Sequence, residues 1–358
     1  MNNNILTCFS SSYFDARGKF IRAANEADLP LNSHLHPSLK GPADNELSID
    51  VVEMIPKGAT KLLVITSGLH GIEGYAGSAV QINALNQKVF CNLPQDTGVV
   101  LVHCLNPWGM AYYMRTDENN VDNNRNFLTS FELADLPAQH PLTADAHLAY
   151  VAFPHDQKLQ DQFESEHVKE LQAAFTQGQY LNPEGLFYGG REPSWTNVTW
   201  HKIIGKYIDA GYGGIIHIDI HTGLGPRGHG ELISDHSREH AAFKRAQIIW
   251  GKDAITSSAD GSAASAFITG TIDFSRPGEV TSICFEFGTI PNVRVVLDAL
   301  IQANHSFFDG FANTTLRNDA IARMKAAFCP DDPLWLASMI NQCDHAFQKA
   351  IRGFDKIT

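Results

Sequence analysis

Two histidines and two glutamates that could build a zinc site come from three separate parts of the sequence. His70 and Glu73 occur in SGLHGIEG, where flanking glycines would let the loop bring both side chains to one point. His221 and Glu286 belong to short apolar segments, GIIHIDIHTG and SICFEFGT. Imidazole nitrogen and carboxylate oxygen are both good ligands for Zn²⁺. These residue types would therefore support activation of water by a divalent metal.

The HxxE spacing alone is weak evidence, because it occurs three times in the sequence. The pair His167 and Glu170 lies in the polar segment ESEHVKELQ, which is typical of a solvated helix face. His236, Glu239 and His240 spell HxxEH, the inverted zinc-peptidase signature, which would place two histidines on one helical face. The charges around this motif favour a solvated first turn of a helix instead. HxxEH nevertheless remains an alternative metal site.

Residues that could bind a substrate follow the second apolar run. Arg115 lies eight residues beyond Pro107, and Asn124 and Arg125 occur within NVDNNRNF. A guanidinium group matches a carboxylate with two parallel hydrogen bonds, so an Asn–Arg pair in a loop can hold an acidic group. An asparagine-rich turn with an arginine that caps a helix explains NNRNF equally well.

Alternation along GIIHIDIHTG places His217, Asp219 and His221 on one face of a strand. His221 stands at the carboxyl end, whereas His217 lies deeper and is typical of a hydrogen-bonded core histidine. Asp219 could accept a hydrogen bond from a metal-bound histidine, or could cap a neighbouring loop. Glu286 lies inside an apolar run and needs a partner, either metal-activated water or a buried arginine.

Short apolar segments predict the elements that position these residues. Four runs rich in valine and isoleucine predict buried strands of a mostly parallel sheet: Lys61–Thr66, Gly98–Cys104, Gly214–Ile220 and Ser282–Phe287. Helical spacing occurs at Tyr75–Val89, Leu159–Gln177, His236–Trp250, Val293–Phe311 and Asp332–Arg352. This alternation indicates the α/β class, with helices on both sheet faces. Such sheets bind ligands just past the carboxyl ends of their strands, where the polar residues stand. We expect a single catalytic domain, residues 1–358, with a long insertion around 129–195.

The composition excludes several classes of function. Hydrophobic residues make up 44% and charged residues 18%, as in a soluble globular enzyme rather than a disordered chain. A formal net charge of −12 disfavours nucleic-acid and anionic-membrane partners. Scattered cysteines without CxxC, and an N-terminus unlike a secretory signal, favour a reducing cytoplasm. The sequence lacks GxSxG and GxxxxGK(S/T), which disfavours serine-nucleophile and P-loop phosphate-binding chemistry.

The motifs in their order resemble the zinc carboxypeptidases of the M14 type, or funnelins. The order is HxxE, NPxG, Arg, NxDxNRN, His and Glu, and it runs from Ser67 to Thr289. The sequence is most similar to a bacterial branch of M14-like proteins, the DUF2817 group, through SGxHGxEG, NVDxNRNF and FEFGT. The resemblance implies a mixed, mostly parallel sheet of about eight strands between helices.

The resemblance also implies a zinc site. Its ligands would be His70, Glu73 and His221, and Asp122 would accept a hydrogen bond from His70. Three protein ligands leave the fourth zinc position open for water, whose pKa zinc lowers to about 7.

The remaining site residues would act on the substrate. Glu286 would be the general base, and Arg115 would polarise the scissile carbonyl and hold the oxyanion. Asn124 and Arg125 would clamp the terminal carboxylate of a small peptide. The implied activity is therefore that of a metallocarboxypeptidase, a zinc-dependent hydrolase of a C-terminal amide bond.

Two departures from the carboxypeptidase pattern leave alternatives open. Those enzymes usually carry a tyrosine between the last zinc histidine and the catalytic glutamate, but no tyrosine lies between His221 and Glu286 here. A tyrosine from elsewhere in the chain, such as Tyr188, would have to take that role, or the role is absent. The DxHTG form at the last ligand resembles succinylglutamate desuccinylase and aspartoacylase, which act on N-acyl amino acids. An N-acyl amino-acid deacylase is thus the alternative function, and a metal-binding protein without catalysis is a third hypothesis.

Overall fold

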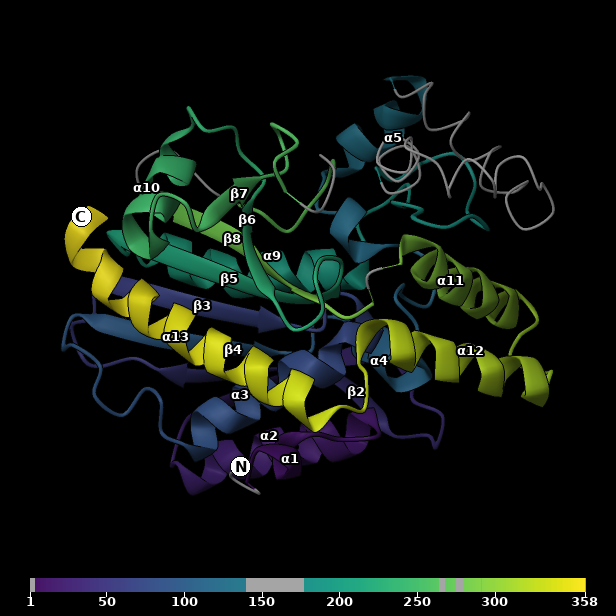
Figure 1. Ribbon diagram of the computed structural model, residues 1–358, viewed down its shortest axis with the longest axis horizontal. Helices are drawn as coiled ribbons and strands as arrows, with labels where there is room; N and C mark the ends of the chain where they lie inside the picture. The colour runs from purple at the N-terminus through teal and green to yellow at the C-terminus, as the bar shows by residue number, and fades with distance from the viewer. Residues whose placement is uncertain (1–3, 140–176, 264–267, 275–279, 291, 358) are drawn as a thin grey trace.

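The computed structural model describes residues 4–139, 177–263, 268–274, 280–290 and 292–357, and its centre is an eight-stranded sheet (Figure 1). The strand order is β1-β2-β4-β3-β5-β8-β6-β7. The strands are β1 (Leu31–Lys40), β2 (Glu46–Met54), β3 (Lys61–Ser67), β4 (Thr97–His103), β5 (Gly214–Gly223), β6 (Gly230–Ser234), β7 (Ile255–Ser257) and β8 (Val280–Gly288). The central strands β4, β3, β5 and β8 run parallel, whereas β1, β2 and β6 are antiparallel to neighbours. The predicted mixed, mostly parallel α/β sheet is confirmed.

The four runs predicted as strands form the middle of this sheet. They became β3, β4, β5 and β8, whose residues are almost all buried, as a strand covered on both faces requires. The outer strands have no comparable pattern in the sequence and were not predicted. β1 lies at the sheet edge and carries the largely exposed segment LNSHLHPSLK, and β7 has only three residues, so neither forms a continuous apolar run.

Helices cover the sheet and extend beyond it. They are α1 (Asn4–Cys8), α2 (Tyr13–Glu26), α3 (Gly74–Asn86), α4 (Pro107–Tyr112), α5 (Ser130–Gln139), α9 (Trp195–Asp209), α10 (Ala241–Trp250), α11 (Val293–Phe308), α12 (Thr314–Phe328) and α13 (Pro333–Ile357). The predictions for α3, α11 and α13 are confirmed within a few residues at each end. Helices α9 and α12 were not predicted. Helix α10 begins at Ala241 and not at His236, because His240 is its N-cap and accepts a hydrogen bond from Ala242 N.

Two apolar layers enclose the sheet. On one face, Trp200 and Ile203 of α9 belong to the same cluster as Leu62 and Val64 of β3. The other face is covered by α2, α3, α10 and α13, whose buried residues cluster with alternate strand residues such as Ile218. Figure 1 shows α13 crossing the front of the sheet beside α3. Burial on both faces leaves the carboxyl ends of the central strands as the place for polar chemistry.

Part of the predicted organisation lies outside the described residues. Residues 140–176 include the pair His167 and Glu170 and all of the predicted helix Leu159–Gln177 except its last residue. A single domain with an insertion around 129–195 therefore stays a prediction. Within the described ranges, no helix combines the length and apolarity that crossing a bilayer requires.

Candidate metal centre and substrate cavity

The loop after β3 places His70 and Glu73 by packing tightly against the loop after β4. Gly68 has a φ of +66°, and a Cβ there would lie 2.8 Å from Cys104 Sγ. A Cβ on Gly71 would lie 2.1 Å from the carbonyl carbon of Gly109. Both positions thus require glycine. The 3₁₀ turn η1 (Gly71–Glu73) then leads directly into α3.

Three side chains converge at the carboxyl ends of β3 and β5. One ligand atom from each of His70, Glu73 and His221 lies within 4.8 Å of the other two. His70 Nδ1 is 2.8 Å from Glu73 Oε1, and His221 Nδ1 is 3.1 Å from Glu73 Oε2. All three residues are at most 3% exposed. The structure therefore brings the three predicted ligands together, because neighbouring parallel strands end at the same edge.

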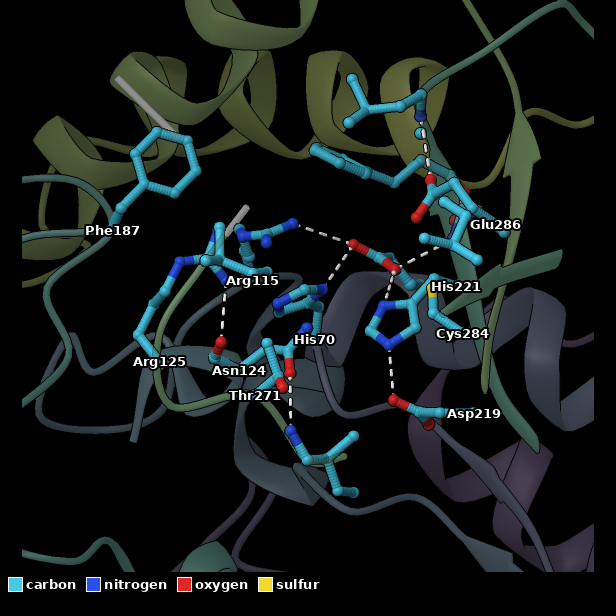
Figure 2. Close-up of a pocket in the computed structure, with 18 of the residues that line it drawn as sticks. His70, Arg115, Asn124, Arg125, Phe187, Asp219, His221, Thr271, Cys284 and Glu286 are labelled. Atoms are coloured by element: carbon cyan, nitrogen blue, oxygen red, sulfur yellow. Dashed lines mark hydrogen bonds and ion pairs between the residues drawn. The ribbon is translucent and has the colours of Figure 1, made fainter. Parts of the chain in front are cut away.

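The other nitrogen of each imidazole faces a carboxylate. His70 Nε2 lies 3.0 Å from Asp122 Oδ1. His221 Nε2 lies 2.5 Å from Asp219 Oδ2, as Figure 2 shows. Carboxylate partners of this kind orient metal-binding histidines and fix their tautomers. They leave Nδ1 of each ring directed toward Glu73.

The donor set fits a zinc ion. His70 Nδ1 is buried and makes no hydrogen bond within the described part of the chain, despite its short distance to Glu73. A bound cation would give this nitrogen a partner. Two histidines and one carboxylate are also a common ligand set of zinc sites with an open position. Among the residues that the structure describes, this is the only group of three or more such side chains close enough to hold a metal.

Opposite charges compensate for burial in this cluster. Burial raises the pKa of Glu73, but His70 and His221 outweigh burial and hold it well below its ordinary value. Burial lowers the pKa of His221, but Asp219 and Glu73 outweigh that effect and raise it well above its ordinary value. Glu73 and His221 thus stabilise each other's charged forms.

Arg115 is held beside the candidate ligands by two carboxylates. Its Nε donates to Asp122 Oδ2 and its Nη1 donates to Glu73 Oε1, each at 3.0 Å. Asp122 Oδ1 also accepts from the backbone N–H of Asn124 at 3.0 Å. Burial raises the pKa of Asp122, but Arg115, Arg125 and His70 outweigh burial and hold it well below its ordinary value. Asp122 therefore orients a predicted ligand and a predicted substrate-binding residue together.

A cavity opens beside the three ligands, and Glu286 lies on its wall (Figure 2). Glu286 of β8 pairs in register with His221 of β5, and its Oε1 accepts from Leu224 N at 2.9 Å. Burial and the nearby Glu73 carboxylate raise the pKa of Glu286 to about 8. A carboxyl group with a pKa near neutrality is suited to proton transfer.

Asn124 and Arg125 lie on the 3₁₀ turn η2 (Asn123–Arg125) and line the same cavity. Asn124 Oδ1 accepts from Ile272 N at 3.0 Å, and Arg125 Nη1 donates to the carbonyl of Asn124 at 2.8 Å. The ring of Phe187 stands 5.6 Å from the guanidinium carbon of Arg115 and 5.9 Å from that of Arg125. The cavity thus has a cationic side with an aromatic lining.

Several residues of this region are not among the predicted site residues. Phe187 and the acidic residues Asp235 and Asp273 also line the cavity. Phe187 stands next to Tyr188 in a glycine-rich stretch without apolar periodicity, so the sequence carries no signal for this position. Thr66 and Ser282 are hydroxyl residues at the ends of predicted apolar runs, and they contact the residues behind His221. A hydroxyl group within a buried apolar strand needs a hydrogen-bond partner, so their place in these runs is a signal of polar contacts there.

The HxxEH alternative does not fit the structure. Residues 236–240 precede α10 and are not helical, so they do not present two histidines on one helical face. The His236 and His240 rings stack with centroids 3.9 Å apart, but no group of three potential ligands forms there among the described residues. No tyrosine, Tyr188 included, is among the described residues that line the cavity.

Comparisons with known proteins agree with this architecture. Residues 9–342 match the model of the family described as "Protein of unknown function (DUF2817)". No curated protein matches the sequence. Thrombin activatable fibrinolysis inhibitor is 11% identical, with 95% of this chain and 73% of that chain covered and a TM-score of 0.50.

Two further solved structures are similar at lower scores. Carboxypeptidase A from Helicoverpa armigera is 15% identical over 89% of this chain and 74% of its own, with a TM-score of 0.48. Succinylglutamate desuccinylase from Chromobacterium violaceum is 14% identical, with 90% of this chain and 76% of that chain covered and a TM-score of 0.39. The family match covers most of the sequence and includes every residue of the candidate centre. The chain therefore belongs to the DUF2817 family, and its α/β fold is similar to that of thrombin activatable fibrinolysis inhibitor.

Proposed function

We propose that this protein is a zinc-dependent hydrolase that cleaves a C-terminal amide bond of a small peptide. The observation that carries the proposal is the convergence of His70, Glu73 and His221 within 4.8 Å, beside a cavity that Glu286 lines. His70, Glu73 and His221 would hold the zinc ion. When bound, zinc would supply the Lewis acidity that polarises a carbonyl and makes water a nucleophile near neutral pH.

Glu286 would move the protons of the reaction. Its carboxylate would accept a proton from the attacking water and return it to the leaving amine. The backbone N–H of Leu224 bonds one carboxylate oxygen at 2.9 Å, so the other oxygen can face the cavity. A single group that acts first as base and then as acid meets the needs of amide hydrolysis.

The arginines would bind and stabilise the substrate. Arg115 lies beside the candidate ligands and offers N–H donors where negative charge develops on the carbonyl oxygen. Contributions of this type are typically about 2.7–4 kcal/mol. Arg125 would hold the terminal carboxylate, with Asn124 supporting its guanidinium through the carbonyl bond.

A second candidate function is deacylation of an N-acyl amino acid by the same residues. Two observations favour it. Asp219 bonds His221 Nε2 at 2.5 Å in the DxHTG segment, and no tyrosine is among the described residues that line the cavity. The two functions share metal, base and arginines, and both release an amino acid. They differ in the acyl group that is removed from it, which is a peptidyl group in one case and a small acid in the other.

Elemental analysis of the purified protein, followed by product analysis, tests the proposal. We expect about one zinc per chain and release of a C-terminal amino acid from N-blocked dipeptides, with activity lost after chelation and restored by Zn²⁺. Release of a small acid from N-acyl amino acids, with peptides intact, would select the deacylase. Bound zinc without hydrolysis of either substrate class would show that the protein binds metal without catalysis. Absence of zinc binding would refute the whole proposal.

A further inference from the structure

A buried chain of hydrogen bonds lies behind His221, on the side away from Glu73. Thr66 Oγ1 is 2.5 Å from Asp219 Oδ1 and 2.9 Å from His217 Nε2. His217 Nδ1 is 2.7 Å from Ser282 Oγ. The residues come from β3, β5 and β8, where Thr66 pairs in register with Asp219 and His217 with Ser282. All of them are at most 2% exposed.

The direction of every hydrogen bond follows from the chemistry of the groups. The Asp219 carboxylate only accepts, so Thr66 donates its one hydroxyl hydrogen to Asp219. Thr66 must then accept from His217 Nε2–H. His217 Nδ1 is therefore an acceptor, and Ser282 donates to it. This arrangement needs a neutral His217, which agrees with burial lowering its pKa to about 4.

We propose that Thr66, His217 and Ser282 are positioning residues for the metal centre, since their aligned donors hold Asp219 in place and thereby direct Nδ1 of His221 toward the cation. The inference rests on the proposed function only through the metal site. Aligned hydrogen bonds in a low-dielectric interior polarise one another, so each donor strengthens the next. Asp219 is held on one oxygen by Thr66 and on the other by His221, which leaves its carboxylate one orientation.

A similar pair elsewhere in the sheet lacks this connection. Ser78 Oγ lies 2.8 Å from His103 Nε2, and both residues are at most 1% exposed. The other nitrogen of this ring, His103 Nδ1, has no hydrogen-bond partner among the described residues. This second hydroxyl–imidazole pair therefore stabilises the fold without reaching a metal ligand, and it provides a matched control.

Zinc affinity of the full-length chain, measured by competition with a chromogenic chelator, tests the proposal. Thr66→Val keeps the shape of the side chain and removes its donor, so zinc should bind about 10-fold more weakly, the lower end of effects seen for outer partners of ligands. Thr66→Ser restores the hydroxyl and should restore affinity. Ser78→Ala should lose unfolding stability but bind zinc as the unaltered protein does. Cobalt substitution gives a second readout, because a displaced His221 changes the absorption of the bound ion.

The outcomes separate this inference from the proposed function. Wild-type zinc affinity in Thr66→Val, or an equal loss in Ser78→Ala, would overturn the positioning role while leaving the zinc hydrolase intact. If Thr66→Val does not fold, Ser282→Ala decides, since it removes the donor to His217 and should also weaken zinc binding; unchanged affinity there would overturn the role. An unaltered chain that binds no zinc would overturn both proposals.

Discussion

At the scale of single residues, the candidate site separates proton transfer from metal binding. Glu286 comes from β8 and does not belong to the group of three ligands, although it lines the same cavity. We expect Glu286→Gln to retain zinc and to lose hydrolysis by about 10²–10⁴-fold, because the amide cannot accept a proton from water. Steady-state rates with a blocked dipeptide, together with elemental analysis, measure both effects.

The matched control for this variant is Glu231→Gln. Glu231 of β6 pairs with Glu286 in the antiparallel ladder but is not among the described residues that line the cavity. Its substitution should leave the rate near the wild-type value. Normal turnover of Glu286→Gln would remove the assignment of Glu286 as the base.

Asp122 carries a second residue-scale prediction. Its carboxylate bonds His70 and Arg115 at 3.0 Å each, so Asp122→Asn removes a negative charge that orients both groups. We expect zinc affinity to fall by about 10–100-fold. A chelator competition titration checks this, and affinity equal to that of the unaltered protein would contradict it. Asp50→Asn removes a buried aspartate elsewhere in the sheet and should leave zinc affinity unchanged.

At the scale of elements, one ion pair docks helix α2 on strand β2. Arg17 bonds Asp50 through Nε at 2.7 Å and through Nη2 at 3.1 Å, and the Asp50 side chain is fully buried. Burial raises the pKa of Asp50, but bonds from Arg17 and Ser33 outweigh burial and lower it. The carboxylate is therefore charged and paired in the folded state, and α2 is fastened to the sheet through it.

We expect Asp50→Asn to lower the free energy of unfolding by about 2–3 kcal/mol. Loss of one partner from a fully buried pair costs about 3–5 kcal/mol, and we expect less here because the Arg17 side chain is 19% exposed. Urea unfolding measures the change. Asp15→Asn, which removes the largely exposed pair with Lys19, should cost less than about 1 kcal/mol. Equal losses in the two variants would contradict the docking role of Asp50.

At the scale of the whole molecule, buried histidines make stability depend on pH. Burial lowers the pKa of His103 from 6.5 to about 4 and that of His217 likewise. Between these pH values the unfolded chain binds protons that the folded chain does not, so stability falls as the pH falls from 6.5 to 4. Each histidine contributes up to about 3 kcal/mol to this loss.

His103→Gln tests the pH dependence. Glutamine does not titrate, so the unfolding free energy of the variant should fall less steeply between pH 6.5 and 4, by up to about one proton. Urea unfolding at half-unit pH steps gives both slopes. Parallel curves for the variant and the unaltered protein would show that His103 does not carry the effect.

The sequence by itself determined the residue types of the site, their order and the central strands. Apolar periodicity is local, so β3, β4, β5 and β8 could be predicted from single runs, as could the position of His221 at a strand end. The glycines around His70 also indicated a loop that brings His70 and Glu73 to one point, and His70 Nδ1 lies 2.8 Å from Glu73 Oε1. These features depend on neighbours within a few residues along the chain.

Only the tertiary structure decided which partners these residues meet. The choice of His70 and Glu73 over the HxxEH motif, and the contacts of Thr66, His217 and Ser282, depend on the register of strands far apart in sequence. Phe187 reaches the cavity from a segment without apolar periodicity. Hydrogen bonds act over about 3 Å, so a pattern along one chain segment cannot reveal a partner that only folding brings within that distance.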